Sequence, residues 1–117
     1  MSALTTHILD TSLGKPAAGV RIHLHKRVGN QSQHLSTHMT NDDGRCDSPI
    51  LAGEAFTIGT YELVFEMGAY LRQNHTPLPE PLFLDQIVIR FGISNAQDHY
   101  HVPLLVSPFG YSTYRGS

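Results

Sequence analysis

Apolar and polar residues alternate along most of this chain, and this two-residue period restricts the possible folds more than any other feature of the sequence. Mostly apolar side chains alternate with mostly polar ones in five segments, at residues 20–25, 35–40, 61–66, 87–91 and 100–106. Successive side chains of a β-strand point to opposite faces, so this alternation is typical of strands. In the first segment Val20, Ile22 and Leu24 would share a buried face, while His23 and His25 would share the polar outer face.

Turn-forming residues separate these segments at short intervals. Glycine, proline, asparagine or aspartate mark residues 14–16, 29–30, 41–44, 53, 59 and 77–81. Many short strands with such turns predict an all-β sandwich or barrel. Residues 67–74 alternate only weakly and could form one short helix before the proline-rich stretch. At 117 residues the chain suits a single domain, residues 1–117, with an all-β fold and one small helix.

Composition and charge exclude several classes of function. The net charge of −2 gives no support to nucleic-acid binding, which needs a basic surface. No apolar run approaches the roughly 20 residues that cross a bilayer, so we expect no membrane partner. The first seven residues lack the basic and apolar segments of a secretory signal. Cys46 is the only cysteine and cannot form an internal disulfide, so we expect a reducing, cytoplasmic location.

Histidine is unusually frequent and titrates closest to neutral pH, so it invites acid–base chemistry or metal binding. The eight histidines are His7, His23, His25, His34, His38, His75, His99 and His101. His23 and His25 lie two residues apart on one predicted strand face, as do His99 and His101, and such pairs can bind zinc or copper. A structural zinc site usually needs four ligands, however, and Cys46 lies beside no histidine. We therefore expect no metal site, although a metal-binding sandwich built on His23 and His25 is an alternative.

Motifs for nucleophilic and nucleotide chemistry are missing from the sequence. The chain contains neither Gly-x-Ser-x-Gly nor Gly-x-Gly-x-x-Gly, and Cys46 lacks the local signature of an activated thiol. What remains is a set of polar residues on apolar or tightly turned segments. His7 interrupts a further strand expected at the start of the chain, between Thr6 and residues 8–9. Arg45 closes the turn of residues 41–45, and His101 lies in the last predicted strand. Two imidazoles and a guanidinium could transfer protons, stabilise negative charge and bind a planar amide or carboxylate edge of a small polar molecule.

The end of the chain is unusually rich in aromatic and cationic side chains, which often take part in binding. Residues 111–117 carry two tyrosines and an arginine directly after the apolar segment of residues 102–106. Chain ends are usually poorly ordered unless something holds them. Aromatic rings and a guanidinium at this position predict a tail that docks on a surface and has a role. The alternative is an adhesive but idle terminus.

Six short motifs spread over the whole chain carry a family resemblance. They are Thr6-His7-Ile8-Leu9-Asp10, Gly14-Lys15-Pro16-Ala17, residues 40–45 (Thr-Asn-Asp-Asp-Gly-Arg), residues 59–65 (Gly-Thr-Tyr-Glu-Leu-Val-Phe), residues 99–105 (His-Tyr-His-Val-Pro-Leu-Leu) and Tyr114-Arg115-Gly116-Ser117. With these motifs the chain resembles the transthyretin-related proteins and, within them, the 5-hydroxyisourate hydrolases of urate degradation. Thyroid-hormone carriers of this group share the fold and a Tyr-Ser-Thr lead-in, whereas the hydrolases end in Tyr-Arg-Gly-Ser, as this chain does.

The resemblance implies a two-sheet β-sandwich of about eight strands with one short helix. It also implies a homotetramer, a dimer of dimers, with active sites in a central channel where residues of facing subunits meet. The implied reaction is hydrolysis of 5-hydroxyisourate to 2-oxo-4-hydroxy-4-carboxy-5-ureidoimidazoline by attack of water on a cyclic amide carbonyl, without a metal or an organic cofactor. The alternative is a carrier that binds a small aromatic ligand in the same channel, although a carrier does not need a set of histidines and an arginine.

The resemblance also implies a role for each matching residue. His7 and His101 would position and deprotonate the attacking water and handle protons during ring opening, and either could be the base. Arg45 would bind the substrate edge and stabilise the anionic intermediate. Tyr114 would contact the substrate, and a neighbouring subunit alone would order the tail. The pocket would be shaped by Arg115, Gly116 and Ser117.

Overall fold

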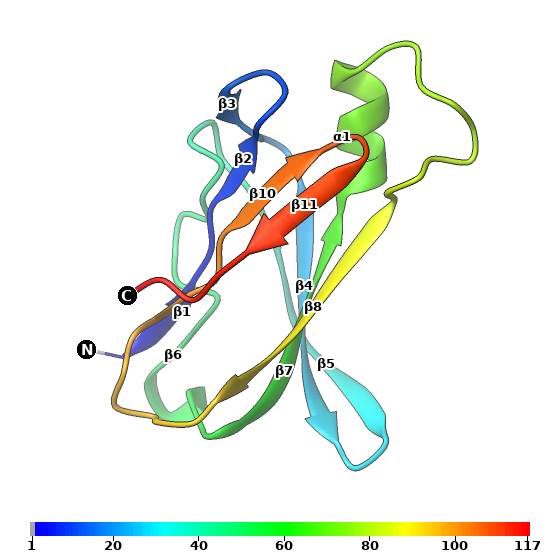
Figure 1. Ribbon diagram of the computed structural model, residues 1–117. Coiled ribbons are helices and arrows are strands. Elements are labelled where there is room, and N and C mark those ends of the chain that lie inside the picture. The colour runs from blue at the N-terminus through cyan, green and yellow to red at the C-terminus, as the bar shows by residue number, and fades with distance from the viewer. Residues whose placement is uncertain (1) are drawn as a thin grey trace.

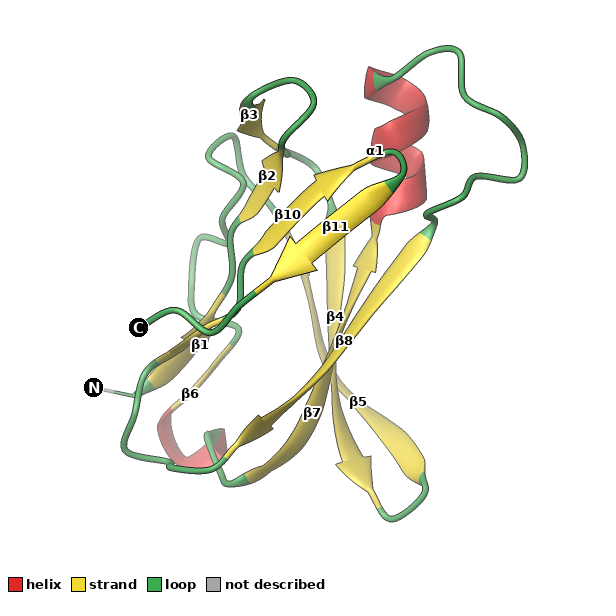
Figure 2. Ribbon diagram, in the orientation of Figure 1, coloured by secondary structure: helices red, strands yellow, loops and turns green. Residues whose placement is uncertain are grey.

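The computed structural model describes residues 2–117 and packs two layers of β-sheet against each other (Figure 1). The strands are β1 (Ala3–Thr5), β2 (Ile8–Asp10), β3 (Lys15–Pro16), β4 (Arg21–Val28), β5 (Gln31–Met39), β6 (Leu51–Ala52), β7 (Gly59–Glu66), β8 (Gln86–Ile93), β9 (Tyr100–His101), β10 (Leu104–Ser107) and β11 (Gly110–Thr113). The helices are the 3₁₀ helix η1 (Gly53–Ala55) and the α-helix α1 (Met67–Asn74). Strands dominate the molecule (Figure 2), and the predicted all-β sandwich with one short α-helix is confirmed.

One layer is a four-stranded antiparallel sheet in the order β5-β4-β7-β8. Its buried face follows the predicted alternation, because Ile22 and Leu24 of β4 and Leu63 and Phe65 of β7 are fully buried. Their neighbours along each strand point to the opposite face of the sheet. This inward face therefore forms half of the hydrophobic core.

β5 departs from this pattern. The strand itself is confirmed, but none of its residues is buried, and Leu35 and Met39 are 40% and 53% exposed. β5 is an edge strand, and the hairpin that it forms with β4 projects beyond the other layer (Figure 1). A bulge next to His25 shifts the register so that His34 faces it. Alternation therefore predicts the strand but not a buried face, because the other layer does not extend to this end.

The second layer consists of two short sheets, in the orders β6-β1-β9 and β11-β10-β2-β3. β1 leads into β2 and β9 leads into β10, so the two sheets are consecutive parts of one layer. Residues 2–117 form eleven strand segments, whereas the resemblance implies about eight. The difference arises because two strands are interrupted and because β3 and β6 have only two residues each.

Both interrupted strands break at the same level. β9 ends at His101 and β10 begins at Leu104, since Pro103 has no N–H with which to continue the ladder. β1 and β2 leave Thr6 and His7 between them, and Leu104 N donates to His7 O at 2.9 Å across the break. The strand predicted at the end of the chain is therefore divided in two. His7 therefore lies in the break between β1 and β2, and His101 lies at the end of the neighbouring strand β9.

The helix α1 follows β7 directly and has the predicted bounds, residues 67–74. Met67 and Leu71 are fully buried, so the helix closes one end of the core. His75 N donates to Leu71 O at 2.9 Å and ends the helix. No helix in residues 2–117 has the length and apolar character needed to span a membrane.

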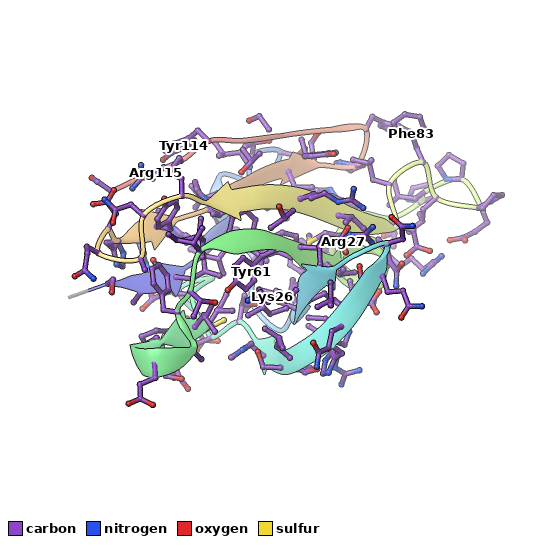
Figure 3. The ribbon with its side chains drawn as sticks, turned by 90° about the horizontal axis from the view of Figure 1, so that it is seen from below. Lys26, Arg27, Tyr61, Phe83, Tyr114 and Arg115 are labelled. Carbon is purple, nitrogen blue, oxygen red and sulfur yellow. The ribbon has the colours of Figure 1, made fainter. Side chains whose placement is uncertain are left out.

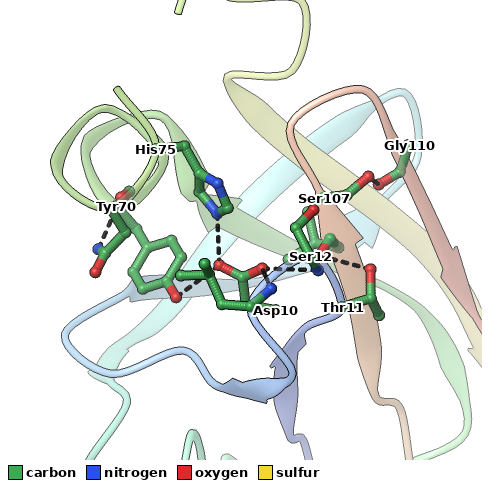
Figure 4. Close-up of polar contacts among 10 residues, drawn as sticks. Asp10, Thr11, Ser12, Tyr70, His75, Ser107 and Gly110 are labelled. Carbon is green, nitrogen blue, oxygen red and sulfur yellow. Dashed lines mark hydrogen bonds and ion pairs between the residues drawn. The ribbon is translucent and has the colours of Figure 1, made fainter. Parts of the chain in front are cut away.

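A buried polar cluster ties α1 to β2 (Figure 4). The hydroxyl of Tyr70 donates to Oδ2 of Asp10 at 2.8 Å, and His75 Nε2 contacts the same oxygen at 2.7 Å. Oδ1 of Asp10 accepts from the backbone N–H groups of Ser12 and Leu13, each at 3.1 Å. Asp10, Tyr70 and His75 are called the Asp10 cluster below. Every oxygen of the buried carboxylate is thus satisfied.

Candidate active site

A tight turn that begins at Asn41 positions Arg45. Asn41 N donates to Arg45 O at 2.7 Å, and Gly44 N donates to Asn41 O at 2.9 Å. Ile8 N donates to Gly44 O at 2.9 Å, which fixes the turn to the residue that follows His7. Gly44 has a φ of +74°, and a Cβ at this position would lie only 2.5 Å from Ile8 O. Only glycine allows this close contact with β2. The turn therefore holds Arg45 near enough to His7 for its charge to act on that imidazole.

His101 reaches the same place from the neighbouring strand. β1 and β9 pair in parallel with Thr5 opposite His101, and His7 follows Thr5 by two residues. The charge of Arg45 acts on both imidazoles, and His7 also acts on His101. His7, Arg45 and His101 therefore form one electrostatic unit, which we call the His–Arg group. All three residues were predicted from the sequence.

Both imidazoles of the His–Arg group favour the neutral form. Partial burial lowers the pKa of His7 below its ordinary value of 6.5, and the charge of Arg45 lowers this pKa further. A hydrogen bond to the backbone of Asp43 and the charge of the Asp43 carboxylate both act in the opposite direction. Burial likewise lowers the pKa of His101, followed by the charges of Arg45, His7 and His99. A neutral imidazole can accept a proton, so either histidine can act as a general base near neutral pH.

The hydroxyl of Thr5 forms a hydrogen bond with one ring nitrogen of His101. Thr5 Oγ1 lies 2.9 Å from His101 Nδ1 and 3.2 Å from His99 Nε2, so it bridges two imidazoles. Nε2 is therefore the nitrogen of His101 that is left to face a substrate. The sequence patterns do not single out Thr5, and they mark His99 only as a metal-ligand candidate beside His101. Spacing is the sequence signal that could have identified both residues, because Thr5 precedes His7 by two residues and His99 precedes His101 by two.

The C-terminal tail docks on its own chain. β11 pairs with β10, and beyond β11 Gly116 N donates to His101 O at 2.7 Å while His101 N donates to Gly116 O at 3.3 Å. Arg115 Nη2 donates to His99 O at 3.1 Å, and the guanidinium lies 4.0 Å from the centre of the Tyr100 ring. The docking predicted from the composition of the tail is therefore confirmed. The expectation that a neighbouring subunit alone orders the tail is wrong, because strand pairing within the chain already holds it.

Gly116 forms a wall beside the His101 imidazole. A Cβ at position 116 would lie 3.1 Å from Cδ2 of His101 and 3.2 Å from its Cβ. A larger residue would therefore have to displace the ring or the tail. Ser117 follows as an exposed residue at the end of this wall.

Tyr114 and Arg45 line separate pockets within one chain. Tyr114 is 59% exposed and, together with Arg115, lines a pocket of about 240 Å³ that also includes residues of β8. Arg45 lines another pocket, of about 200 Å³, next to the end of β1. Figure 3 shows Tyr114 and Arg115 close together at one edge of the sandwich. Tyr114 and Arg45 therefore do not share either of these pockets within one chain.

Three histidines outside the His–Arg group also lie close together. His23 and His25 of β4 and His34 of β5 have ring centres 5.3 to 6.5 Å apart. The hydroxyl of Thr37 contacts both His23 Nδ1, at 3.0 Å, and His34 Nε2, at 2.9 Å. Over residues 2–117, however, no three His, Cys, Asp or Glu side chains are arranged to hold a metal ion. The metal-binding alternative based on His23 and His25 therefore gains no support from the geometry.

Known proteins match this chain over nearly its whole length. The model of the HIUase/Transthyretin family matches residues 4–116. A 5-hydroxyisourate hydrolase of Mesorhizobium japonicum is 61% identical over 114 residues, which cover 97% of this chain and 91% of that protein. The solved structure of Klebsiella pneumoniae 5-hydroxyisourate hydrolase has a TM-score of 0.81 at 38% identity and covers 100% of both chains. The crystal structure of sea bream transthyretin in complex with thyroxine has a TM-score of 0.85 at 26% identity, covering 97% of this chain and 94% of that chain.

These matches agree with the two-layer sandwich and with the resemblance carried by the six sequence motifs. The likeness to both solved structures confirms the transthyretin-like fold. The chain belongs to the HIUase/Transthyretin family.

Proposed function

We propose that this chain hydrolyses 5-hydroxyisourate to 2-oxo-4-hydroxy-4-carboxy-5-ureidoimidazoline, a step in the breakdown of urate. The observation that carries the proposal is the meeting of two imidazoles of lowered pKa with one guanidinium at the strand break. A relative that is 61% identical bears the name of this hydrolase, which supports the same substrate here. Residues 1–117 would act as one catalytic domain in the cytoplasm, without a metal or an organic cofactor.

Hydrolysis would begin with attack of water on the cyclic amide carbonyl. One neutral imidazole, of His7 or His101, takes a proton from the water as the water oxygen bonds to the carbonyl carbon. The ring C–N bond then breaks, and the protonated imidazole returns its proton to the leaving nitrogen. The ring opens with one water consumed and the imidazole restored. General acid–base catalysis of this kind contributes about 10²- to 10⁴-fold to a rate.

Arg45 would stabilise the negative charge that develops on the carbonyl oxygen. A guanidinium is a cation whose planar N–H donors match the edge of a cyclic amide. The side chain is exposed in the single chain, so a ligand can reach it. Its charge also lowers the pKa of both imidazoles. The same cation therefore keeps the base unprotonated and stabilises the oxyanion.

The chain would act as a homotetramer, a dimer of dimers. Among the described residues, β8 and β11 each pair with a neighbour on one side only. An unpaired strand edge offers N–H and C=O groups to another chain. Val88 of β8 and Tyr111 of β11 are each 47% exposed and would be covered in such an assembly.

Assembly would complete the pocket around the tail. Because Tyr114 and Arg45 line different pockets within one chain, Tyr114 would contact a substrate held mainly by a facing subunit. Aromatic side chains with a polar tip are suited to this position between an apolar wall and a polar ligand. The pocket wall would be formed by Arg115, Gly116 and Ser117.

Kinetics with 5-hydroxyisourate made freshly by urate oxidase test the proposal. The substrate decays spontaneously, so the measured quantity is acceleration over that decay. We expect His7→Ala, Arg45→Ala and His101→Ala each to lose at least about 100-fold in kcat/KM while the tetramer stays intact. His34→Ala is the matched control, because His34 is exposed on β5, and should retain activity. Near-normal turnover in all three site variants would overturn the site, and no acceleration by the wild type would overturn the function.

Two further measurements address the alternatives. A chelator should leave the rate unchanged, whereas a loss of activity that zinc restores would revive the metal-binding alternative. Tight binding of a small aromatic ligand by a wild type without hydrolase activity would favour the carrier.

A further inference from the structure

The hydroxyl of Thr5 connects His101 to a histidine outside the His–Arg group. Thr5 Oγ1 lies 2.9 Å from Nδ1 of His101 and 3.2 Å from Nε2 of His99. A hydroxyl donates one hydrogen bond and accepts others, so it can accept from one imidazole while it donates to the second. The three side chains can therefore form one continuous chain of hydrogen bonds.

Strand register holds both ends of this chain of hydrogen bonds in place. Thr5 is opposite His101 in the parallel ladder, and Val102 N donates to Thr5 O at 2.9 Å. His99 precedes His101 by two residues, and Arg115 Nη2 donates a hydrogen bond to the backbone oxygen of His99 at 3.1 Å. Threonine has a branched β-carbon and therefore few rotamers. The hydroxyl is thus fixed between two imidazoles whose backbones are also fixed.

We propose that Thr5 and His99 form a proton relay with His101, in which Thr5 sets the tautomer of His101 and His99 takes up the proton. The relay rests on the proposed hydrolase function. At rest, Nδ1–H of His101 donates to Thr5 Oγ1, and the Thr5 hydroxyl donates to Nε2 of His99. Nε2 of His101 then carries a lone pair, as a general base requires. Thr5 and His99 are positioning residues, because they act on the water through His101.

Three protons move when water attacks. The water gives a proton to Nε2 of His101 while its oxygen bonds to the carbonyl carbon. His101 passes its Nδ1 proton to Thr5 Oγ1, and Thr5 passes its own hydroxyl proton to Nε2 of His99. His101 and Thr5 end the step neutral, and His99 carries the positive charge that balances the oxyanion. The protons return along the same path when the C–N bond breaks and the leaving nitrogen takes a proton from Nε2 of His101.

The charges around His101 favour this transfer. Burial disfavours a positive charge on the His101 ring, and the neighbouring cationic groups disfavour it further. The groups that act on His101 are Arg45 from the turn after β5, His7 from the break between β1 and β2, and His99 before β9. The tail presents the backbone of Gly116. No carboxylate is among these groups, so the relay removes a charge that no partner would stabilise on His101.

Nitrogen NMR of the histidine side chains tests the resting state without substrate. We expect His101 to show the Nδ1–H tautomer in the wild type and in Thr5→Ser, and a mixture of tautomers in Thr5→Val. Thr11→Val is the matched control, because Thr11 Oγ1 donates to the backbone oxygen of Val106 at 3.2 Å and contacts no imidazole. An unchanged His101 tautomer in folded Thr5→Val would overturn the proposal.

A proton inventory of kcat in mixtures of H₂O and D₂O tests the transfer itself. His99→Gln keeps a hydrogen-bonding partner for Thr5 but cannot take up a proton. We expect a curved inventory in the wild type and a straight one in His99→Gln and Thr5→Val, with kcat lower by about 10- to 100-fold and KM little changed. Thr5→Ser should regain most of the rate. A merely structural contact would lower stability without changing the curvature.

The outcomes separate the relay from the proposed function. Wild-type kcat in His99→Gln, or the same curvature in His99→Gln and the wild type, would overturn the relay. A wild type without hydrolase activity would instead overturn the function, and the tautomer measurement would still decide whether Thr5 controls His101.

Discussion

Two polar clusters lie at opposite ends of β2, and their histidines have different partners. In one cluster the imidazole contacts a carboxylate, and in the other the imidazoles lie near a guanidinium. The Asp10 cluster surrounds one buried carboxylate with a tyrosine and an imidazole (Figure 4). The His–Arg group combines two imidazoles with a guanidinium at the break before β2. In the first cluster, hydrogen bonds stabilise a carboxylate. In the second, the backbone places a guanidinium beside two imidazoles, and its charge opposes their protonation.

This difference decides what each cluster can do. Burial alone would raise the pKa of Asp10, but hydrogen bonds from His75 and Tyr70 hold it below 3.8. Burial and the bond to Asp10 in turn raise the pKa of Tyr70 above its usual range. These groups do not exchange protons near neutral pH, which suits a structural role. For His7 and His101, burial and the charge of Arg45 lower the pKa, although the Asp43 carboxylate acts against this at His7, so both imidazoles favour the neutral form that accepts a proton.

Removal of the Asp10 carboxylate should give the largest effect. Asp10→Ala takes the acceptor from the Tyr70 hydroxyl, the His75 imidazole and two backbone N–H groups. A buried polar group left without its hydrogen-bond partner costs about 1–3 kcal/mol, and this change leaves several such groups. We therefore expect the free energy of unfolding to fall by about 3 kcal/mol or more. Chemical denaturation measures this loss, while kcat per folded molecule should stay within a few-fold of the wild type.

Asp10→Asn serves as the control for charge. The folded-state pKa of Asp10 is depressed, so the carboxylate stabilises the fold above pH 3.8, and this stabilisation is lost as the pH falls through the folded-state value. The acid-induced loss of stability should therefore be weaker in Asp10→Asn. An Asp10→Ala variant with unchanged stability, or with a kcat as low as that of His101→Ala, would show that the two clusters are not separate in role.

Deletion of residues 114–117 should act mainly on the His–Arg group. It removes the hold of Arg115 on His99 and the backbone bonds between Gly116 and His101, but it leaves the Asp10 cluster intact. Misplacement of a catalytic group by about 1 Å can cost about 100-fold, so we expect kcat/KM to fall by about that factor. The melting temperature should change little, and both quantities are measured on the same preparation. An unaffected rate would mean that the tail is idle.

The fold follows from the sequence where a local pattern decides the structure. Alternation predicts β4, β7 and β8, and its weakening at residues 67–74 predicts α1 with the observed bounds. Alternation does not predict that β5 is exposed on both faces, because that depends on how far the other layer extends. The division of the last long strand follows from Pro103, but its match to the break before β2 depends on parallel pairing of distant segments.

The candidate site follows from the sequence only as a set of residues. His7, Arg45 and His101 stand out because each is polar on an apolar or tightly turned segment, and the resemblance assigns their roles. Their meeting depends on the pairing of β1 with β9 and on the close contact at Gly44, which no short motif reveals. The sequence patterns do not predict Thr5, because its two-residue spacing from His7 gains meaning only when a second strand brings a histidine to its hydroxyl.

The smallest expected effect is a shift in pH dependence, and it tests why the His–Arg group is neutral. The general base must be unprotonated, and burial together with Arg45 lowers the pKa of His7 and His101 in the folded chain. A lowered pKa keeps the imidazole neutral at more acidic pH, so activity should persist below pH 6.5. Arg45→Met removes the charge but keeps an apolar stem, so the acid limb of kcat/KM should move to higher pH.

The position of the acid limb is read against each variant's own plateau, because Arg45→Met also slows turnover. Arg21→Met is the matched control, since Arg21 is exposed on β4 in the other layer, and it should leave the limb in place. Asp10→Asn should also leave the limb in place, because Asp10 does not act on either imidazole of the His–Arg group. A limb that Arg45→Met does not move would mean that burial alone keeps the imidazoles neutral. The contrast between the two clusters would then lie in their exposure to solvent, and the charge of Arg45 would serve the oxyanion only.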